Sequence, residues 1–138
     1  MFWLSHHHPE EYNRTYRLGG HGGVRVCARC LGTYPVLLGV LVTLFKLRAP
    51  LSWPGDVPAV LGLTLPALVD WAVGRFRPAA GSNAVRTLTG VLLGAALGRS
   101  LFIHLQHPLP PVLLWQAALV AGVAVPVLLT TARRPPEG

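Results

Sequence analysis

Two cysteines near the amino terminus are the residues of this sequence most able to do chemistry. Cys27 and Cys30 stand two residues apart, a spacing at which two thiolates can bind one tetrahedral metal ion. Arg25 and Arg29 flank the thiols and favour their thiolate form. Four upstream histidines could supply the two missing ligands: His6, His7, His8 and His21. The segment therefore predicts a Cys/His metal site, with zinc as the expected ion and iron as the alternative.

Two other interpretations of the cysteine pair stay open. A Cys-x-x-Cys in a membrane chain resembles the quinone-coupled disulfide-forming enzymes, but those need a second cysteine pair, and this chain has only two cysteines. Cys27 and Cys30 could also serve only as small apolar residues near the start of a helix. The glycines around His21 form a permissive loop, which could fold the histidines back onto the thiols or act as a flexible linker.

A second polar set lies within apolar sequence. Asp70 falls about four residues before the end of one apolar stretch, and Arg86 lies at a similar depth in the next. Because an unpaired charge in lipid is costly, the two predict an ion pair across a helical hairpin. Ser82 and Asn83 stand where a helix cap is expected. The alternative is that Asp70, Asn83 and Arg86 line a polar pocket beside the cysteines.

The elements that must position these residues are apolar. Of the 138 residues, 51% are hydrophobic and 12% charged, against about 25% charged in soluble domains. Four stretches approach the roughly 20 residues of a membrane span, at about 31–47, 57–74, 84–105 and 111–131. Spans of this kind must be helices, so the fold class is an all-α polytopic bundle. We expect a His/Cys segment over 1–30, the helical domain over 31–132 and a tail over 133–138.

The basic residues predict the orientation of the spans. Nine of them fall on one side: Arg14, Arg17, Arg25, Arg29, Arg75, Arg77, Arg86, Arg133 and Arg134. Only Lys46 and Arg48 fall on the other side. The positive-inside rule then places both termini in the cytoplasm and the chain in the inner membrane. The net charge of +7 flanks spans instead of forming a basic face on a soluble module, so we expect no nucleic-acid partner.

The third span carries its own pattern. Gly90, Gly94 and Gly98 recur at intervals of four and therefore lie along one side of a helix, where they let another backbone approach closely. This ridge predicts helix packing within the bundle, or else docking of a membrane protein partner or a second copy. Arg99 lies deeper, and its head group is expected to extend outward past His104.

Two stretches resemble one known family. Residues 26–34 resemble the Cys-Ala-Arg-Cys-x-Gly-x-Tyr signature of a family of small prokaryotic membrane proteins, a domain of unknown function. The family also shows an aspartate late in a span, followed by Ser-Asn, Arg and Thr-Gly, as in Asp70, residues 82–83, Arg86 and residues 89–90 here. The resemblance covers roughly residues 5 to 98. Relatives open with Cys-His where this chain has Ser5-His6, so a histidine would have to replace that cysteine as a ligand.

These observations lead to one main hypothesis and two rivals. The main one is a membrane metalloprotein with a cytoplasmic-face Cys/His site, acting on a lipid or a membrane-delivered substrate if a coordination position stays open. The first rival is a non-catalytic scaffold or accessory subunit with a structural metal. The second is a small transporter or a thiol-redox protein. Whether the protein is an enzyme stays open at this point.

Overall fold

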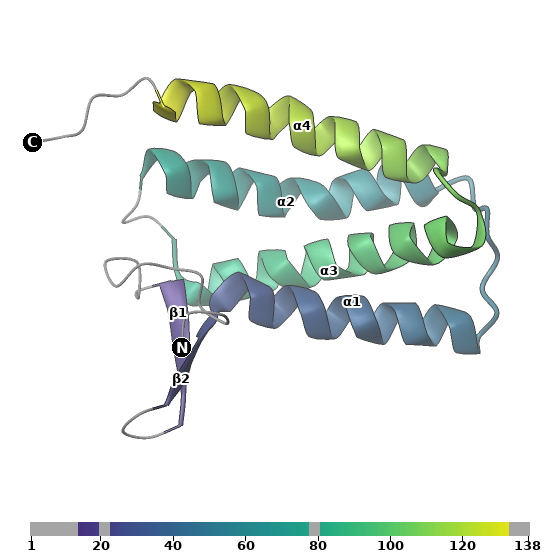
Figure 1. The fold of residues 1–138 in the computed structure, drawn as a ribbon, viewed down its shortest axis with the longest axis horizontal. Helices are drawn as coiled ribbons and strands as arrows, with labels where there is room; N and C mark the ends of the chain where they lie inside the picture. The colour runs from purple at the N-terminus through teal and green to yellow at the C-terminus, as the bar shows by residue number, and fades with distance from the viewer. Residues whose placement is uncertain (1–13, 20–22, 78–80, 133–138) are drawn as a thin grey trace, which may run out of the picture.

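Four helices follow a short β-hairpin (Figure 1). The computed structural model describes residues 14–19, 23–77 and 81–132. The helices are α1 (Ala28–Lys46), α2 (Asp56–Phe76), α3 (Asn83–Gln106) and α4 (Pro111–Ala132). Each is long and apolar enough to cross a membrane. The prediction of four helical spans is confirmed.

Local sequence explains where the helices begin and end. Ser82 caps α3, because its hydroxyl accepts a hydrogen bond from the Val85 N–H at 3.3 Å. The same helix stops before Pro108, since the residue that precedes a proline is biased away from helical conformation. Between α1 and α2, Arg48 adopts a positive φ of 48° and the prolines of residues 50–54 prevent the helix from continuing.

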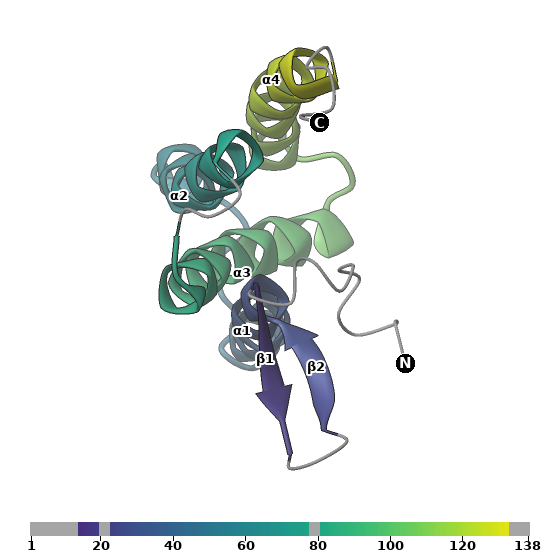
Figure 2. The ribbon, with the colours of Figure 1, turned by 90° about the vertical axis from the view of Figure 1, so that its left-hand side faces the viewer.

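The helices stand side by side in the order α4, α2, α3, α1 (Figures 1 and 2). α3 packs along both α1 and α2, and α2 also packs along α4. The amino end of α1, the carboxyl end of α2, the amino end of α3 and the carboxyl end of α4 therefore share one end of the molecule, together with the hairpin (Figure 1). We call it the hairpin end.

Glycines set the contact between α1 and α3. A Cβ atom added to Gly90 would collide with the carbonyl oxygen of Arg29, and one added to Gly94 with that of Thr33. A Cβ on Gly98 would fall 2.9 Å from the Val40 side chain. The ridge of glycines is thus used inside the chain, against α1, and two backbones approach there closely.

α2 and α4 are held together differently. Gln116 and Thr64 are buried, and the Gln116 amide donates a hydrogen bond to the Thr64 hydroxyl at 2.9 Å. Thr64 in turn donates to the Val60 carbonyl oxygen at 2.8 Å, as polar side chains within helices of membrane proteins commonly do. The nearby apolar core joins Val60 of α2 with residues of α3 and Val112 of α4.

The hairpin is an element that the sequence analysis did not predict. β1 (Thr15–Leu18) pairs antiparallel with β2 (Val24–Cys27), in a register that places Thr15 opposite Cys27. β2 runs directly into α1, so the strand pair is anchored at the helix start. It extends across the direction of the helices and beyond α1 (Figures 1 and 2).

Candidate functional site

Both cysteines lie at the junction of β2 and α1. Cys27 is the last residue of β2 and is buried, and Cys30 lies in the first turn of α1. The two cysteines are not joined by a disulfide, and their side chains lie within hydrogen-bonding reach of each other. The hairpin and the helix thus hold two sulfur atoms side by side, an arrangement suited to a shared metal ion or to reversible oxidation.

The histidines predicted as further ligands, His6, His7, His8 and His21, lie outside the described residues. Among residues 14–19, 23–77 and 81–132, no group of three or more Cys, His, Asp or Glu side chains is placed to hold a metal ion. The described part of the chain therefore supplies two thiols and no third ligand of these types. Any complete Cys/His site depends on the amino-terminal histidines.

Asp70 forms an ion pair with Arg29, one of the two residues between the cysteines. The Thr89 hydroxyl lies 3.5 Å from the same carboxylate oxygen. The sequence analysis named Arg86 as the partner of Asp70 and overlooked Arg29. The sequence did contain a signal for this pairing, because Arg29 is the basic residue of the Cys-Ala-Arg-Cys motif. In the structure, α1 places Arg29 on the side that faces α3 and α2.

Arg86 lies beside the same carboxylate and is buried. A Cβ atom on Gly81 would fall 3.6 Å from both an Arg86 guanidinium nitrogen and an Asp70 carboxylate oxygen, so these two groups flank that glycine. Arg86 also donates to the Asn83 side-chain oxygen at 3.5 Å. Asp70, Asn83 and Arg86 are therefore gathered at the hairpin end beside the cysteine pair.

Residues of β1 and the preceding Arg14 connect this cluster to α2 and α3 through hydrogen bonds. The Asn83 amide donates to the Thr15 carbonyl oxygen at 3.2 Å, and the Arg14 guanidinium donates to the Gly74 carbonyl oxygen at 3.2 Å. The Thr87 hydroxyl lies 3.5 Å from the Tyr16 hydroxyl. Apart from Cys27, no residue of the hairpin was predicted to belong to the site, because the contacts of Thr15 and Tyr16 depend on a strand pair that the short sequence 14–27 does not predict.

The opposite end of the bundle carries a second, partly buried ion pair. Arg99 donates two hydrogen bonds to the Asp56 carboxylate, both at 2.8 Å, and the Trp53 backbone N–H donates to it at 2.9 Å. The expectation for Arg99 named no partner, and Asp56, the first residue of α2, pairs with it at the end of the bundle opposite the hairpin. His104 accepts a hydrogen bond from the Leu109 N–H at 3.1 Å.

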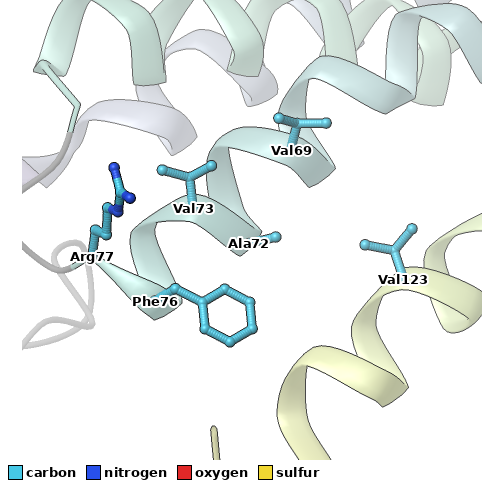
Figure 3. A pocket seen from close by; sticks show the side chains of 6 residues that line it. All are labelled: Val69, Ala72, Val73, Phe76, Arg77 and Val123. Carbon is cyan, nitrogen blue, oxygen red and sulfur yellow. The ribbon is translucent and has the colours of Figure 1, made fainter. Parts of the chain in front are cut away.

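A cavity of about 300 Å³ lies between α2 and α4 (Figure 3). Its lining is almost entirely apolar, with the Phe76 ring and the Val123 side chain directed into the space between the two helices. The residues that line it bring no nucleophile, acid or metal ligand. Of the two places, only the polar cluster at the hairpin end is equipped for chemistry.

The geometry of that cluster combines thiols with charged and hydrogen-bonding groups. Two neighbouring sulfur atoms stand next to Arg29, and Arg29 and Arg86 converge on Asp70. Intramembrane charges of this kind are costly unless paired, and they mark functional positions in many membrane proteins. The arrangement can bind a soft metal ion at the thiols and orient an anionic group beside them.

Comparison with known proteins bears on this cluster. The family described as "Predicted membrane protein (DUF2085)" matches residues 6–100, which include the cysteine pair, Asp70 and Arg86. No curated protein and no solved structure matches the chain. The sequence-based resemblance to a membrane family of unknown function is therefore confirmed, and the four apolar helices agree with it. The chain belongs to this family of predicted multi-pass membrane proteins.

Proposed function

We propose that this membrane protein binds a metal ion, with zinc as the expected ion, through Cys27, Cys30 and two of the amino-terminal histidines. The observation that carries the proposal is the pair of adjacent cysteine side chains, not joined by a disulfide, at the junction of β2 and α1. Zinc completes its tetrahedron with nitrogen ligands from histidine, and the nearest histidines in sequence are His6, His7, His8 and His21.

The neighbouring polar cluster gives the proposed site a second role. If three protein ligands hold the ion, the fourth position takes water, whose pKa a zinc ion lowers toward neutrality. Arg86 and Asn83 would then orient an anionic group of a lipid or membrane-delivered substrate, with Asp70 fixing the arginines. With four protein ligands the site is closed and structural, and the protein acts as a scaffold instead.

We also propose that the hairpin end faces the cytoplasm. The basic residues of the described chain are concentrated at this end, including Arg14, Arg17 and Arg25 on the hairpin and Arg75 and Arg77 at the end of α2. Cytoplasmic ends of membrane helices carry this excess of Arg and Lys. A reducing cytoplasm would keep the cysteines available as thiols.

Metal content of detergent-purified protein tests the proposal. Prepared without chelator, the wild type is expected to carry about one equivalent of zinc or iron by elemental mass spectrometry. The Cys27→Ser/Cys30→Ser variant should lose it, because serine hydroxyls are poor ligands for these ions. The matched control is His104→Gln/His107→Gln, which removes two histidines at the opposite end of the bundle and should leave the metal content unchanged.

Two results would overturn this function. A wild-type protein without metal would exclude the metal site and favour the thiol-redox role of the cysteines. Metal that survives in the double cysteine variant would place the ion elsewhere. Metal retained in the wild type together with four sulfur and nitrogen neighbours by X-ray absorption would select the closed, structural site over the open one.

A further inference from the structure

α4 is packed closely against the bundle near one of its ends. Its two buried residues, Val112 and Gln116, lie in its first two turns, at the end opposite the hairpin. Gln116 forms its hydrogen bond with Thr64 of α2 there. Val123 lies seven residues after Gln116, on the same side of the helix, but it is only partly buried. α4 is therefore less closely packed against α2 toward the hairpin end.

The apolar cavity of Figure 3 lies where this close packing ends. Four of its lining residues share one face of α2, and the others are Arg77 at the end of α2 and Val123 on α4: Val69, Ala72, Val73, Phe76, Arg77 and Val123. Val69 is 54% exposed and Phe76 is 38% exposed, although both are large apolar residues. We call this space of about 300 Å³ the α2–α4 groove.

The size and the surroundings of the α2–α4 groove limit what can occupy it. When the four helices cross a bilayer, the groove opens into hydrocarbon, so its occupant must be apolar. An α-helix with its side chains is about 10–12 Å across, and two turns of a partner helix would need about three times the volume of the groove. A single acyl chain is much thinner than a helix. The groove therefore fits one chain of a lipid better than a helix of another protein.

The charge at the mouth of the groove fits the head group of an anionic lipid. Arg77 is the C-cap residue of α2 and is exposed, so it lies where this helix leaves the hydrocarbon. Among the described residues that line the groove, none is acidic. The carboxyl end of a helix dipole does not attract an anion, so the attraction must come from the arginine itself. A guanidinium group binds phosphate through two parallel hydrogen bonds.

We infer that the α2–α4 groove binds one anionic phospholipid, whose acyl chain lies between Val73 and Val123 and whose phosphate lies against Arg77. The inference is independent of the metal site. The groove lies on the side of α2 that faces α4, whereas Asp70 of the polar cluster pairs with Arg29 of α1. The bound lipid fills the space that the side chains of α2 and α4 leave open, and it thereby connects α4 to the bundle at the hairpin end.

Native mass spectrometry of the full chain in detergent, with equal amounts of phosphatidylglycerol and phosphatidylcholine, tests the inference. The wild type is expected to retain one lipid, with a preference of about fivefold for phosphatidylglycerol, as expected for one arginine near an anionic head group. Val123→Phe fills the groove and should lower the retention of both lipids several-fold. The matched control is Val125→Phe, which adds the same ring on another side of α4 and should retain the lipid. A wild type without lipid, or an equal loss in both variants, would overturn the inference.

A charge variant tests the head-group contact. Arg77→Gln is expected to remove the preference for phosphatidylglycerol and to leave the retention of phosphatidylcholine unchanged. The matched control is Arg75→Gln, because Arg75 lies over the Trp71 ring and does not line the groove, and this variant should keep the preference. Both arginines are exposed, so both variants should melt like the wild type. A preference that survives in Arg77→Gln, or a retained mass that is a polypeptide instead of a lipid, would overturn the inference.

Discussion

The two outer helices of the molecule, α1 and α4, are attached in opposite ways. α1 lies against the glycines of α3, where backbone meets backbone and no side chain can be inserted at Gly90 or Gly94. α4 lies against α2 through side chains, with a buried hydrogen bond between Gln116 and Thr64 and a cavity farther along (Figure 3). The glycines of the two inner helices differ as well: those of α3 contact α1, whereas Gly62 of α2 faces open space.

This difference indicates that α1 is held in a more fixed position than α4. Close backbone packing tolerates no change in helix separation, so α1 holds the cysteine junction rigidly over α3. α4 is the most apolar helix, and few of its residues are buried. The candidate site accordingly draws its described residues from the hairpin, α1, α2 and α3, and the family match, which ends at residue 100, does not include α4.

Among the described residues, two ion pairs join neighbouring helices, one at each end of the bundle. Arg29 of α1 pairs with Asp70 of α2 at the hairpin end, and Asp56 of α2 pairs with Arg99 of α3 at the other. The second pair is a closed clasp of one acid and one base, with the Trp53 N–H as a further donor. The first lies beside a second arginine and two thiols, and for this reason we regard it as part of a site and not only as a clasp.

The largest effect is expected when the closed clasp is broken. Asp56→Asn leaves the partly buried Arg99 without its counter-charge, and losing one partner of a fully buried ion pair costs about 3–5 kcal/mol, which is the upper bound here. We expect a clearly lower melting temperature, measured by tryptophan fluorescence in detergent. The double variant Asp56→Asn/Arg99→Gln serves as control and should recover part of the loss, because it removes the unpaired charge. An unchanged melting temperature for the single variant would contradict a structural clasp.

A smaller loss is expected from one added methyl group at the α1–α3 contact. In Gly94→Ala the new Cβ meets the Thr33 carbonyl oxygen, so the helices must separate, at a cost of about 1–3 kcal/mol. Thermal unfolding in detergent measures the change. Metal content of the same variant sharpens the comparison, since displacement of α1 should also disturb the cysteine junction. A variant as stable as the wild type would show that this contact is not tight.

The smallest effect, and of opposite sign, is expected at the matched position on α2. Gly62→Ala places the same methyl group in open space within a helix, where alanine is favoured over glycine by about 0.5–1 kcal/mol. We expect a melting temperature equal to or slightly above that of the wild type. A loss of stability as large as that of Gly94→Ala would show that the cost of the added methyl group does not come from the close α1–α3 contact.

Features that depend on local sequence were predictable, whereas the partners of the charged residues were not. The four spans, the Ser82 cap and the family resemblance followed from local patterns, and these predictions are confirmed. The partners of the charged residues did not follow. Arg29 was treated as a neighbour of the thiols, although it pairs with Asp70, and no partner was named for Arg99, although it pairs with Asp56. The metal site itself stays a prediction, because its histidines lie outside the described residues.

The sequence by itself determined the number of helices and their membrane character, because length and hydropathy are local properties of each stretch. It also marked the small and charged residues that a membrane helix does not carry without reason. Only the tertiary structure decided which of these residues meet. α1 packs on α3 and α2 on α4, although neither pair is consecutive in the chain, and the hydrophobic pattern of one helix does not reveal which helix lies beside it.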